Sequence, residues 1–178
     1  MYSRIVSVVV LARRWIALML IAAWWGGFSF YSIVVVHTGH RVLQSKLKQG
    51  FITEQVTTQL NWLGAVTLAV LALDLCFDEG RRRFPICWRV SWALWSVMAA
   101  ALAGLWWLHP ILRNLLDFKE RTVRDDDRFT EWHTAYLSVS TVQWIAGILF
   151  FCCLAIRMER WRHASPPTDV AGTISPHK

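Results

Sequence analysis

The stretch WIALMLIAAWWGGFSFYSIVVV, residues 15–36, decides the fold class of this chain. It holds no charged side chain, and as a helix it rises about 33 Å, which is enough to cross the hydrocarbon core of a bilayer. The stretch is too long for the apolar region of a signal peptide, and its WWGG at residues 24–27 lacks the small-residue pattern of a cleavage site. We therefore predict a transmembrane helix here.

Three more apolar stretches of spanning length follow, and the composition is that of a membrane protein. Of the 178 residues, 55% are hydrophobic and 17% are charged, and the charges are confined to short segments between the apolar stretches. The sequence therefore predicts an all-α integral membrane protein, a four-transmembrane-helix up-and-down bundle within residues 15–156. We expect the later spans at residues 56–77, 86–108 and 134–156.

The charges between the spans predict the orientation of the bundle. Eleven Lys and Arg residues lie on the side of the two termini and eight on the other side, and the positive-inside rule places the richer side in the cytoplasm. We expect a multi-pass protein of the cell membrane, or of the inner membrane in a bacterium. Residues 1–14 then form a basic cytoplasmic segment. Residues 157–178 form a cytoplasmic tail, disordered because its polar end has little apolar surface.

The net charge of +7 does not predict a nucleic-acid partner. The cations flank the apolar stretches and form no separate basic module. We expect contacts with membrane lipids and with other membrane subunits instead. The four cysteines lack the spacing of a zinc site, a redox pair or a disulfide framework, so we interpret them as packing residues.

The segments that join the spans carry local signals. Residues 109–133 hold apolar side chains at near-helical spacing, which predicts an amphipathic helix at the outer surface, between the third and fourth spans. These side chains are Ile111, Leu112, Leu115, Leu116 and Phe118. The acidic run at residues 125–127 suits the start of the fourth helix, because carboxylates stabilise its free amides. At residues 78–85, Gly80 and Pro85 predict a tight hairpin.

Four histidines are candidates for binding chemistry. His37 and His40 end the first span, His109 ends the third and His133 opens the fourth, so the predicted topology puts all four on the outer side. Imidazole is a common ligand of transition metals and of haem iron. Three interpretations stay open: an interfacial structural role, a copper-like metal site, and a haem or other prosthetic group.

His133 ranks first among these histidines, because it combines a place at a helix N-terminus with other histidines nearby. If a metal or haem is bound, we expect His37 or His40 to lie opposite it. If nothing is bound, we expect the ring to form a hydrogen bond with the first loop, near Gln44 or Ser45.

Two ionisable residues lie inside the apolar boundaries. Asp74 in the second span and Arg89 in the third flank the same hairpin, and ionisable groups at that depth usually pair or reach the interface. We predict a structural ion pair between them. Passage of protons or ions would need further polar side chains at mid-depth, and the candidates there are few: Asn61, Thr67, Ser96, Ser140 and Gln143.

Three segments resemble a widespread family of four-span membrane proteins of unassigned function, whose mammalian relative is a transmembrane protein linked to platinum-drug resistance. They are HTGHRVLQSKL at residues 37–47, WLHPILRNL at residues 107–115 and RFTEWHTAYLSVS at residues 128–140. The clearest marks are residues 129–133 and the motif Gln44, Ser45 and Lys46. The resemblance covers residues 15–156 and implies a four-helix membrane bundle without a catalytic signature.

The resemblance also singles out positions within these segments. His133 matches the characteristic histidine of the family's fourth helix. Tyr136 stands where the family usually has Ser, Ser140 where it usually has Asn, and His109 where it usually has Arg or Glu. These departures are consistent with a specialised role.

The sequence favours a small non-catalytic polytopic membrane protein, acting as an accessory or assembly subunit that packs against membrane partners. The alternative is the binding or handling of a metal ion or haem by the outer histidines. A transporter is the third hypothesis.

Overall fold

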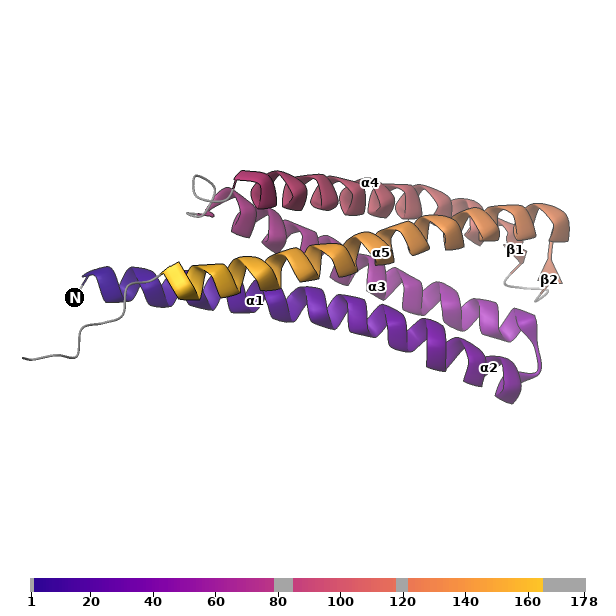
Figure 1. The fold of residues 1–178 in the computed structure, drawn as a ribbon. Coiled ribbons are helices and arrows are strands. Elements are labelled where there is room, and N and C mark those ends of the chain that lie inside the picture. The colour runs from indigo at the N-terminus through magenta and orange to yellow at the C-terminus, as the bar shows by residue number, and fades with distance from the viewer. Residues whose placement is uncertain (1, 79–84, 118–121, 165–178) are drawn as a thin grey trace, which may run out of the picture.

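The apolar stretches fold into four long helices that lie side by side in an elongated bundle (Figure 1). This computed structural model describes residues 2–78, 85–117 and 122–164. Its elements, in chain order, are α1 (Tyr2–Phe30), the π-helix η1 (Tyr31–Val35), α2 (Val36–Leu43), α3 (Lys46–Cys76), α4 (Pro85–Leu115), β1 (Leu116–Asp117), β2 (Thr122–Val123) and α5 (Asp126–Ala164).

Four helical segments are long and apolar enough to cross a membrane, which confirms the predicted four-helix membrane bundle. They are Val8–Leu43, Lys48–Cys76, Pro85–Leu115 and Asp126–Arg160. The start of α1 and the end of α5 lie at the same end of the bundle, which we call the terminal end. The α2–α3 corner and the β1–β2 pair lie at the opposite end, which we call the loop end (Figure 1).

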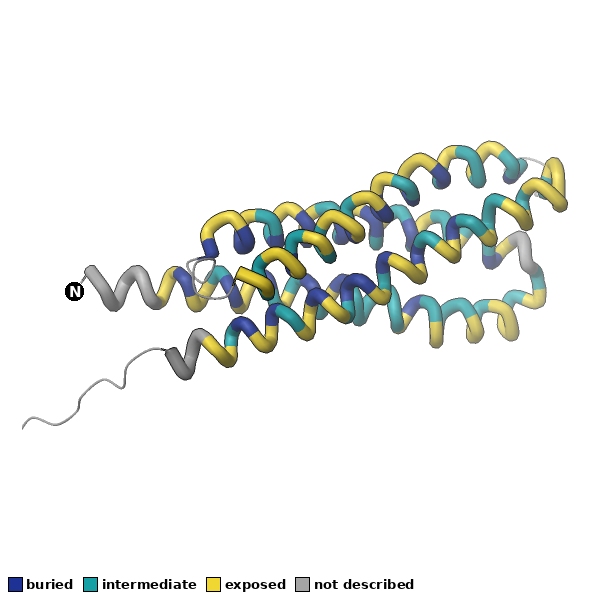
Figure 2. Tube along the Cα trace, turned by 45° about the horizontal axis from the view of Figure 1, so that its top comes forward, coloured by how far each residue is buried: buried dark blue, intermediate teal, exposed yellow. Residues whose placement is uncertain are grey.

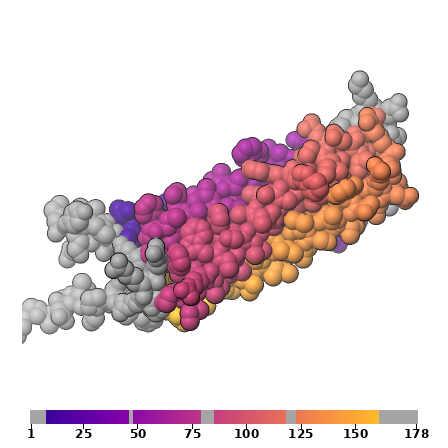
Figure 3. Space-filling view, turned by 90° about the horizontal axis from the view of Figure 1, so that it is seen from above, coloured from indigo at the N-terminus to yellow at the C-terminus, as the bar shows by residue number. Residues whose placement is uncertain are grey.

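Each long helix packs on two neighbours. Helix α1 contacts α3 and α5, and α4 contacts the same two helices. Figure 3 shows α4 and α5 lying against each other along one face of the molecule. The first and fourth spans are therefore neighbours, as an up-and-down bundle predicts.

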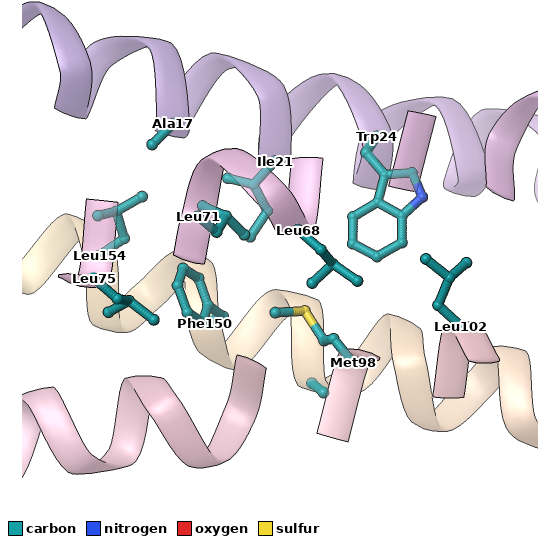
Figure 4. Packing of buried hydrophobic residues seen from close by; sticks show 11 residues of the cluster. Ala17, Ile21, Trp24, Leu68, Leu71, Leu75, Met98, Leu102, Phe150 and Leu154 are labelled. Carbon is teal, nitrogen blue, oxygen red and sulfur yellow. The ribbon is translucent and has the colours of Figure 1, made fainter. Parts of the chain in front are cut away.

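The core lies between the helices toward the middle of the bundle and its terminal end. Ile21 of α1, Leu71 of α3, Met98 of α4 and Phe150 of α5 meet there with almost no exposed surface (Figure 4). A second, smaller cluster of Leu105, Leu108 and Tyr136 lies between α4 and α5 toward the loop end. The helices pack closely at Gly64, where a methyl group would lie 2.8 Å from the Trp24 ring.

Large apolar side chains cover the outside of the bundle. Figure 2 shows exposed residues along the outward faces of the helices and buried residues along the inward faces. Exposed Val, Ile, Leu, Phe and Trp side chains occur on all four spans. A surface of this kind contacts the acyl chains of lipids.

Indole N–H groups join neighbouring helices. Trp95 of α4 donates a hydrogen bond to the Leu68 carbonyl of α3 at 2.9 Å, and Trp144 of α5 donates one to the Ser29 hydroxyl of α1 at 2.8 Å. Polar contacts of this kind hold transmembrane helices together, because lipid offers no alternative partner.

The predicted amphipathic helix between the third and fourth spans is wrong. Helix α4 continues through Pro110 to Leu115, and the chain then forms the short antiparallel pair β1–β2. Proline has no backbone N–H, so Pro110 cannot donate the usual hydrogen bond within the helix. Leu112, beyond the proline, packs on the second core cluster, and this packing stabilises the continued helix. Phe118 lies outside the described residues, as do most of the predicted tight hairpin and the tail beyond residue 164.

Other boundaries also differ from the sequence expectation. Helix α3 begins at Lys46 instead of residue 56, and α1 extends back to Tyr2, so most of residues 1–14 continue the first span as helix. Arg14 at the end of that segment is buried within the bundle, with 3% of its surface exposed.

Candidate functional site

A cavity of about 430 Å³ opens between the helices near the loop end. Its wall is mostly apolar and comes from the first span, α3, the end of α4, β1 and the start of α5. Pockets that bind small molecules have volumes of about 300–1,000 Å³ and apolar walls with a few polar groups. This cavity has that size and lining.

The π-helix η1 shapes one wall of the cavity. It interrupts an otherwise continuous helix from α1 to α2, and its wider turn changes which side chains of the segment that follows point inward. Tyr31 of η1 is buried, and it lines the cavity together with Ser32 and Val36. His40, one turn farther along α2, is exposed at its rim. Single π-turns inside helices are frequent at functional sites.

Three buried polar side chains of the wall have no hydrogen-bond partner among the described residues, and the Tyr31 hydroxyl is one of them. Gln49 of α3 is 4% exposed, and neither its side-chain oxygen nor its nitrogen is paired. Ser140 of α5 is 3% exposed, and its hydroxyl is likewise unpaired. Leaving a buried polar group unpaired costs about 1–3 kcal/mol. A ligand in the cavity would supply partners for all three.

The backbone of α2 fixes the place of Gln49. Gly39 faces its side chain so closely that a methyl group at position 39 would overlap the Gln49 amide. The glycine therefore lets α2 and the start of α3 approach each other with the amide between them. The Gln49 amide is held at the cavity wall by this contact.

Several polar side chains of α3 and α4 contact one another beside the cavity. The His109 ring of α4 lies 3.1 Å from the Thr58 hydroxyl and 3.9 Å from Glu54, both of α3. Arg113 lies 3.9 Å from the same Glu54 oxygen. Glu54, His109 and Arg113 also line a second hollow of about 470 Å³, so they separate it from the cavity.

Three of the four predicted histidines line the cavity. These are His40, His109 and His133, whereas His37 is exposed and does not line it. Among the described residues, no three His, Cys, Asp or Glu side chains lie close enough to share a metal ion.

The His133 ring stacks on Phe129, one turn earlier in α5, with ring centroids 5.6 Å apart. Within the described part of the chain, its ring forms no hydrogen bond with Gln44 or Ser45. The structure thus brings His133 to the same cavity as His40 without a direct bond to the corner between α2 and α3.

The family-motif residues form that corner. Gln44 ends α2 with φ 46° and ψ 23°, which is the left-handed conformation, and Ser45 caps α3 by accepting a hydrogen bond from the Lys48 amide. The two residues turn the chain from α2 directly into α3, and Lys46 is the first residue of α3. The positions that depart from the resemblance, His109, Tyr136 and Ser140, all line the cavity.

Asp74 is paired, but with residues other than Arg89. Its carboxylate lies 3.0 Å from Arg13 of α1 and 3.9 Å from Arg157 of α5. Arg89 is exposed on α4 and forms no ion pair with the described residues. Asp74 points inward, toward α1 and α5, so the shared hairpin does not bring the two predicted partners together.

Sequence reasoning missed Tyr31, Gln49 and Glu54. It placed the last two in a loop, because it began the second span at residue 56. The sequence signal that could have placed Gln49 and Glu54 in a helix is Ser45. Serine favours a helix N-cap, and about ten residues without Pro follow it. A helix that begins there carries both side chains on defined faces.

Comparison with known proteins gives one match. A family model described as "Domain of unknown function (DUF4149)" matches residues 19–120. No curated protein matches the chain, and no solved structure matches it.

Proposed function

Because this chain belongs to the family described as a domain of unknown function (DUF4149), we propose its function from the cavity itself: a non-catalytic membrane protein that binds a small amphipathic molecule there. One observation carries the proposal, namely that the buried amide of Gln49 has no hydrogen-bond partner in the described part of the chain and lines a mostly apolar cavity. An apolar ligand body would fill the space, and a carbonyl, amide or hydroxyl head would pair with Gln49.

The variant Gln49→Leu tests the proposal, because it removes both hydrogen-bonding atoms at similar side-chain volume. The full chain would be purified in detergent, and molecules that remain bound would be identified and counted by native mass spectrometry. We expect the variant to retain its ligand about tenfold less well, since one hydrogen bond contributes about 1.5 kcal/mol. The matched control is Gln59→Leu, the same change at an exposed position of the same helix.

Two results would contradict this function. The first is a wild-type protein that carries no small molecule other than bulk lipid. The second is equal retention by Gln49→Leu and Gln59→Leu, which would place the ligand elsewhere.

The haem or metal alternative is supported by one observation, that His40, His109 and His133 line one cavity. A haem needs one or two axial imidazoles and therefore no cluster of three ligands. Absorbance and metal analysis of the same purified sample would decide it. A Soret band lost in His133→Ala, or one stoichiometric metal ion, would favour this alternative over an organic ligand of another kind.

Packing against membrane partners, as an accessory or assembly subunit, is the second part of the proposal. Its support is the pair Trp62 and Trp106, which lie on neighbouring helices with ring centroids 5.5 Å apart and are 60% and 45% exposed. Exposed tryptophans on a protein surface are frequent anchors at protein interfaces. A photo-crosslinking residue at position 62 should capture a defined membrane protein in cells, and labelling of lipid alone would contradict the role.

The kinship with the mammalian protein linked to platinum-drug resistance stays a prediction from the sequence motifs. So does the placement in the cell membrane with cytoplasmic termini. Both rest on residues in the printed sequence and need their own tests.

A further inference from the structure

The unpaired polar groups of the cavity wall lie at different depths in the bundle. Helices α3 and α5 both begin at the loop end (Figure 1). Gln49 is in the first turn of α3, whereas Ser140 is about four turns into α5. Ser140 therefore lies at the inner end of the cavity, and Gln49 lies near its loop end.

Contacts with the first span give the distance between these two levels. Gly39 of α2 faces the Gln49 amide. The Ser29 hydroxyl of α1 accepts a hydrogen bond from Trp144, which lies one turn beyond Ser140 in α5. A helix rises about 15 Å from Ser29 to Gly39, and Ser140 lies about 6 Å nearer to the loop end than Trp144 does. The levels of Gln49 and Ser140 therefore differ by roughly 10 Å.

The wall of the cavity between these levels is mostly apolar, and it includes Val36 of the first span and Leu137 of α5. Tyr31, whose hydroxyl is the third group without a partner in the described part of the chain, also belongs to a turn between the two levels. A molecule that fills this space therefore needs an apolar body along most of its length.

Each end of the cavity thus has a buried polar group that needs a partner. The Gln49 amide offers both a donor and an acceptor, and so does the Ser140 hydroxyl. Neither group forms a hydrogen bond with another described residue, and a buried polar group in that state is unfavourable. One ligand with an oxygen at each end would satisfy both groups at once.

We propose that the ligand of the cavity is an elongated apolar molecule with a hydroxyl or carbonyl oxygen at each end, and that these two oxygens pair with Gln49 and Ser140. This inference rests on the function proposed above, because it needs a small molecule in the cavity. It narrows the class of ligand. A molecule with a polar group at one end only, such as a simple fatty alcohol, would pair with Gln49 and leave the Ser140 hydroxyl without a partner.

The test compares two alcohols of one chain length, octane-1,8-diol with an oxygen at each end and octan-1-ol with an oxygen at one end. The full chain is purified in detergent, and the binding of each alcohol is measured by native mass spectrometry and by thermal unfolding. We expect the diol to bind about tenfold more tightly, because it forms the second hydrogen bond. Unspecific uptake by apolar surfaces would give the opposite order, since burial of a hydroxyl without a partner is unfavourable.

Two serine variants locate the inner contact. Ser140→Ala should lose the preference for the diol, whereas Ser138→Ala, the same change at an exposed position of α5, should keep it. Loss of the preference in both variants would overturn the role of Ser140.

Equal binding of the two alcohols by the wild type would overturn the inference and leave the proposed function standing. The partner of Ser140 would then be a water molecule in the hollow of about 20 Å³ beside it. Binding of neither alcohol would also overturn the inference, and the comparison of Gln49→Leu with Gln59→Leu would then decide the proposed function alone.

Discussion

Gly39 and Gln49 touch where α2 approaches the start of α3, and the contact leaves no room for a side chain on the glycine. We predict that Gly39→Ala raises the free energy of unfolding less than Gly26→Ala does, by roughly 1 kcal/mol, because the methyl group at position 39 must push the flexible end of Gln49 aside. Chemical unfolding in micelles would measure this. Gly26→Ala is the control: nothing lies within 4 Å of the new methyl group, and Ala favours a helix more than Gly does. Equal effects of the two variants would contradict the close contact.

The partners of Asp74 give a second prediction. Replacing Asp74 by Ala leaves Arg13 and Arg157 without one of their counterions, and breaking a buried pair costs about 3–5 kcal/mol. We expect Asp74→Ala and Arg13→Ala to be non-additive in a thermal-unfolding cycle by about 1 kcal/mol or more. Asp74→Ala and Arg89→Ala should add within about 0.5 kcal/mol. Coupling to Arg89 as large as that to Arg13 would contradict the pairing seen in the structure.

At the scale of single residues, the sequence identified side chains of interest, but it did not identify the residues that they contact. Asp74 stood out as a charge inside an apolar stretch, and three of the four histidines selected do line one cavity. Their partners depend on how each helix is turned about its axis, and neighbouring residues in a helix point about 100° apart. A pattern along one chain does not fix that rotation between helices, so Asp74 was assigned to the wrong arginine.

At the scale of elements, the corner between α2 and α3 contains a backbone conformation that limits which residue can stand at position 44. Gln44 has a left-handed backbone, which is unfavourable for a side chain branched at Cβ and harmless for glycine. We predict that Gln44→Val lowers the free energy of unfolding by about 1 kcal/mol or more, whereas Gln44→Gly leaves it unchanged or raises it. The two variants at one position control for loss of the glutamine side chain. A stable Gln44→Val with a weakened Gln44→Gly would contradict the corner.

The existence of the four spans was predictable because each is a long apolar run, but their ends were not. Pro110 and the charges after it indicate a stop, yet α4 continues to Leu115 because the residues beyond the proline have apolar neighbours to pack against. The π-turn at residues 31–35 has no sequence signal in an unbroken apolar stretch. Tertiary packing determines both the continuation of α4 past Pro110 and the π-turn. Residues of these two segments also line the cavity.

At the scale of the whole molecule, the side of the membrane that holds the termini is still a prediction. The count of eleven Lys and Arg residues against eight includes Arg13, Arg14 and Arg157, which the folded bundle pairs with carboxylates. Without these three, the two sides would be equal. The orientation is set during insertion, before the helices pack and before these arginines meet the carboxylates near the ends of the spans. We therefore keep all eleven in the count and predict cytoplasmic termini.

Reporter fusions measure this orientation directly. A fluorescent protein that folds only in the cytoplasm, joined after Lys178, should fluoresce, and alkaline phosphatase joined there should be inactive. After Asp117, which follows three spans, the same two reporters should give the opposite result, because β1 lies at the loop end. Changing Arg13, Arg14 and Arg157 together to Gln makes the two sides equal in positive charge, so a mixed orientation is expected if those arginines direct insertion. Active phosphatase at Lys178 in the wild type would reverse the topology, and it would place the ion pairs of Arg13, Arg14 and Arg157 in the outer leaflet and the cavity at the cytoplasmic side.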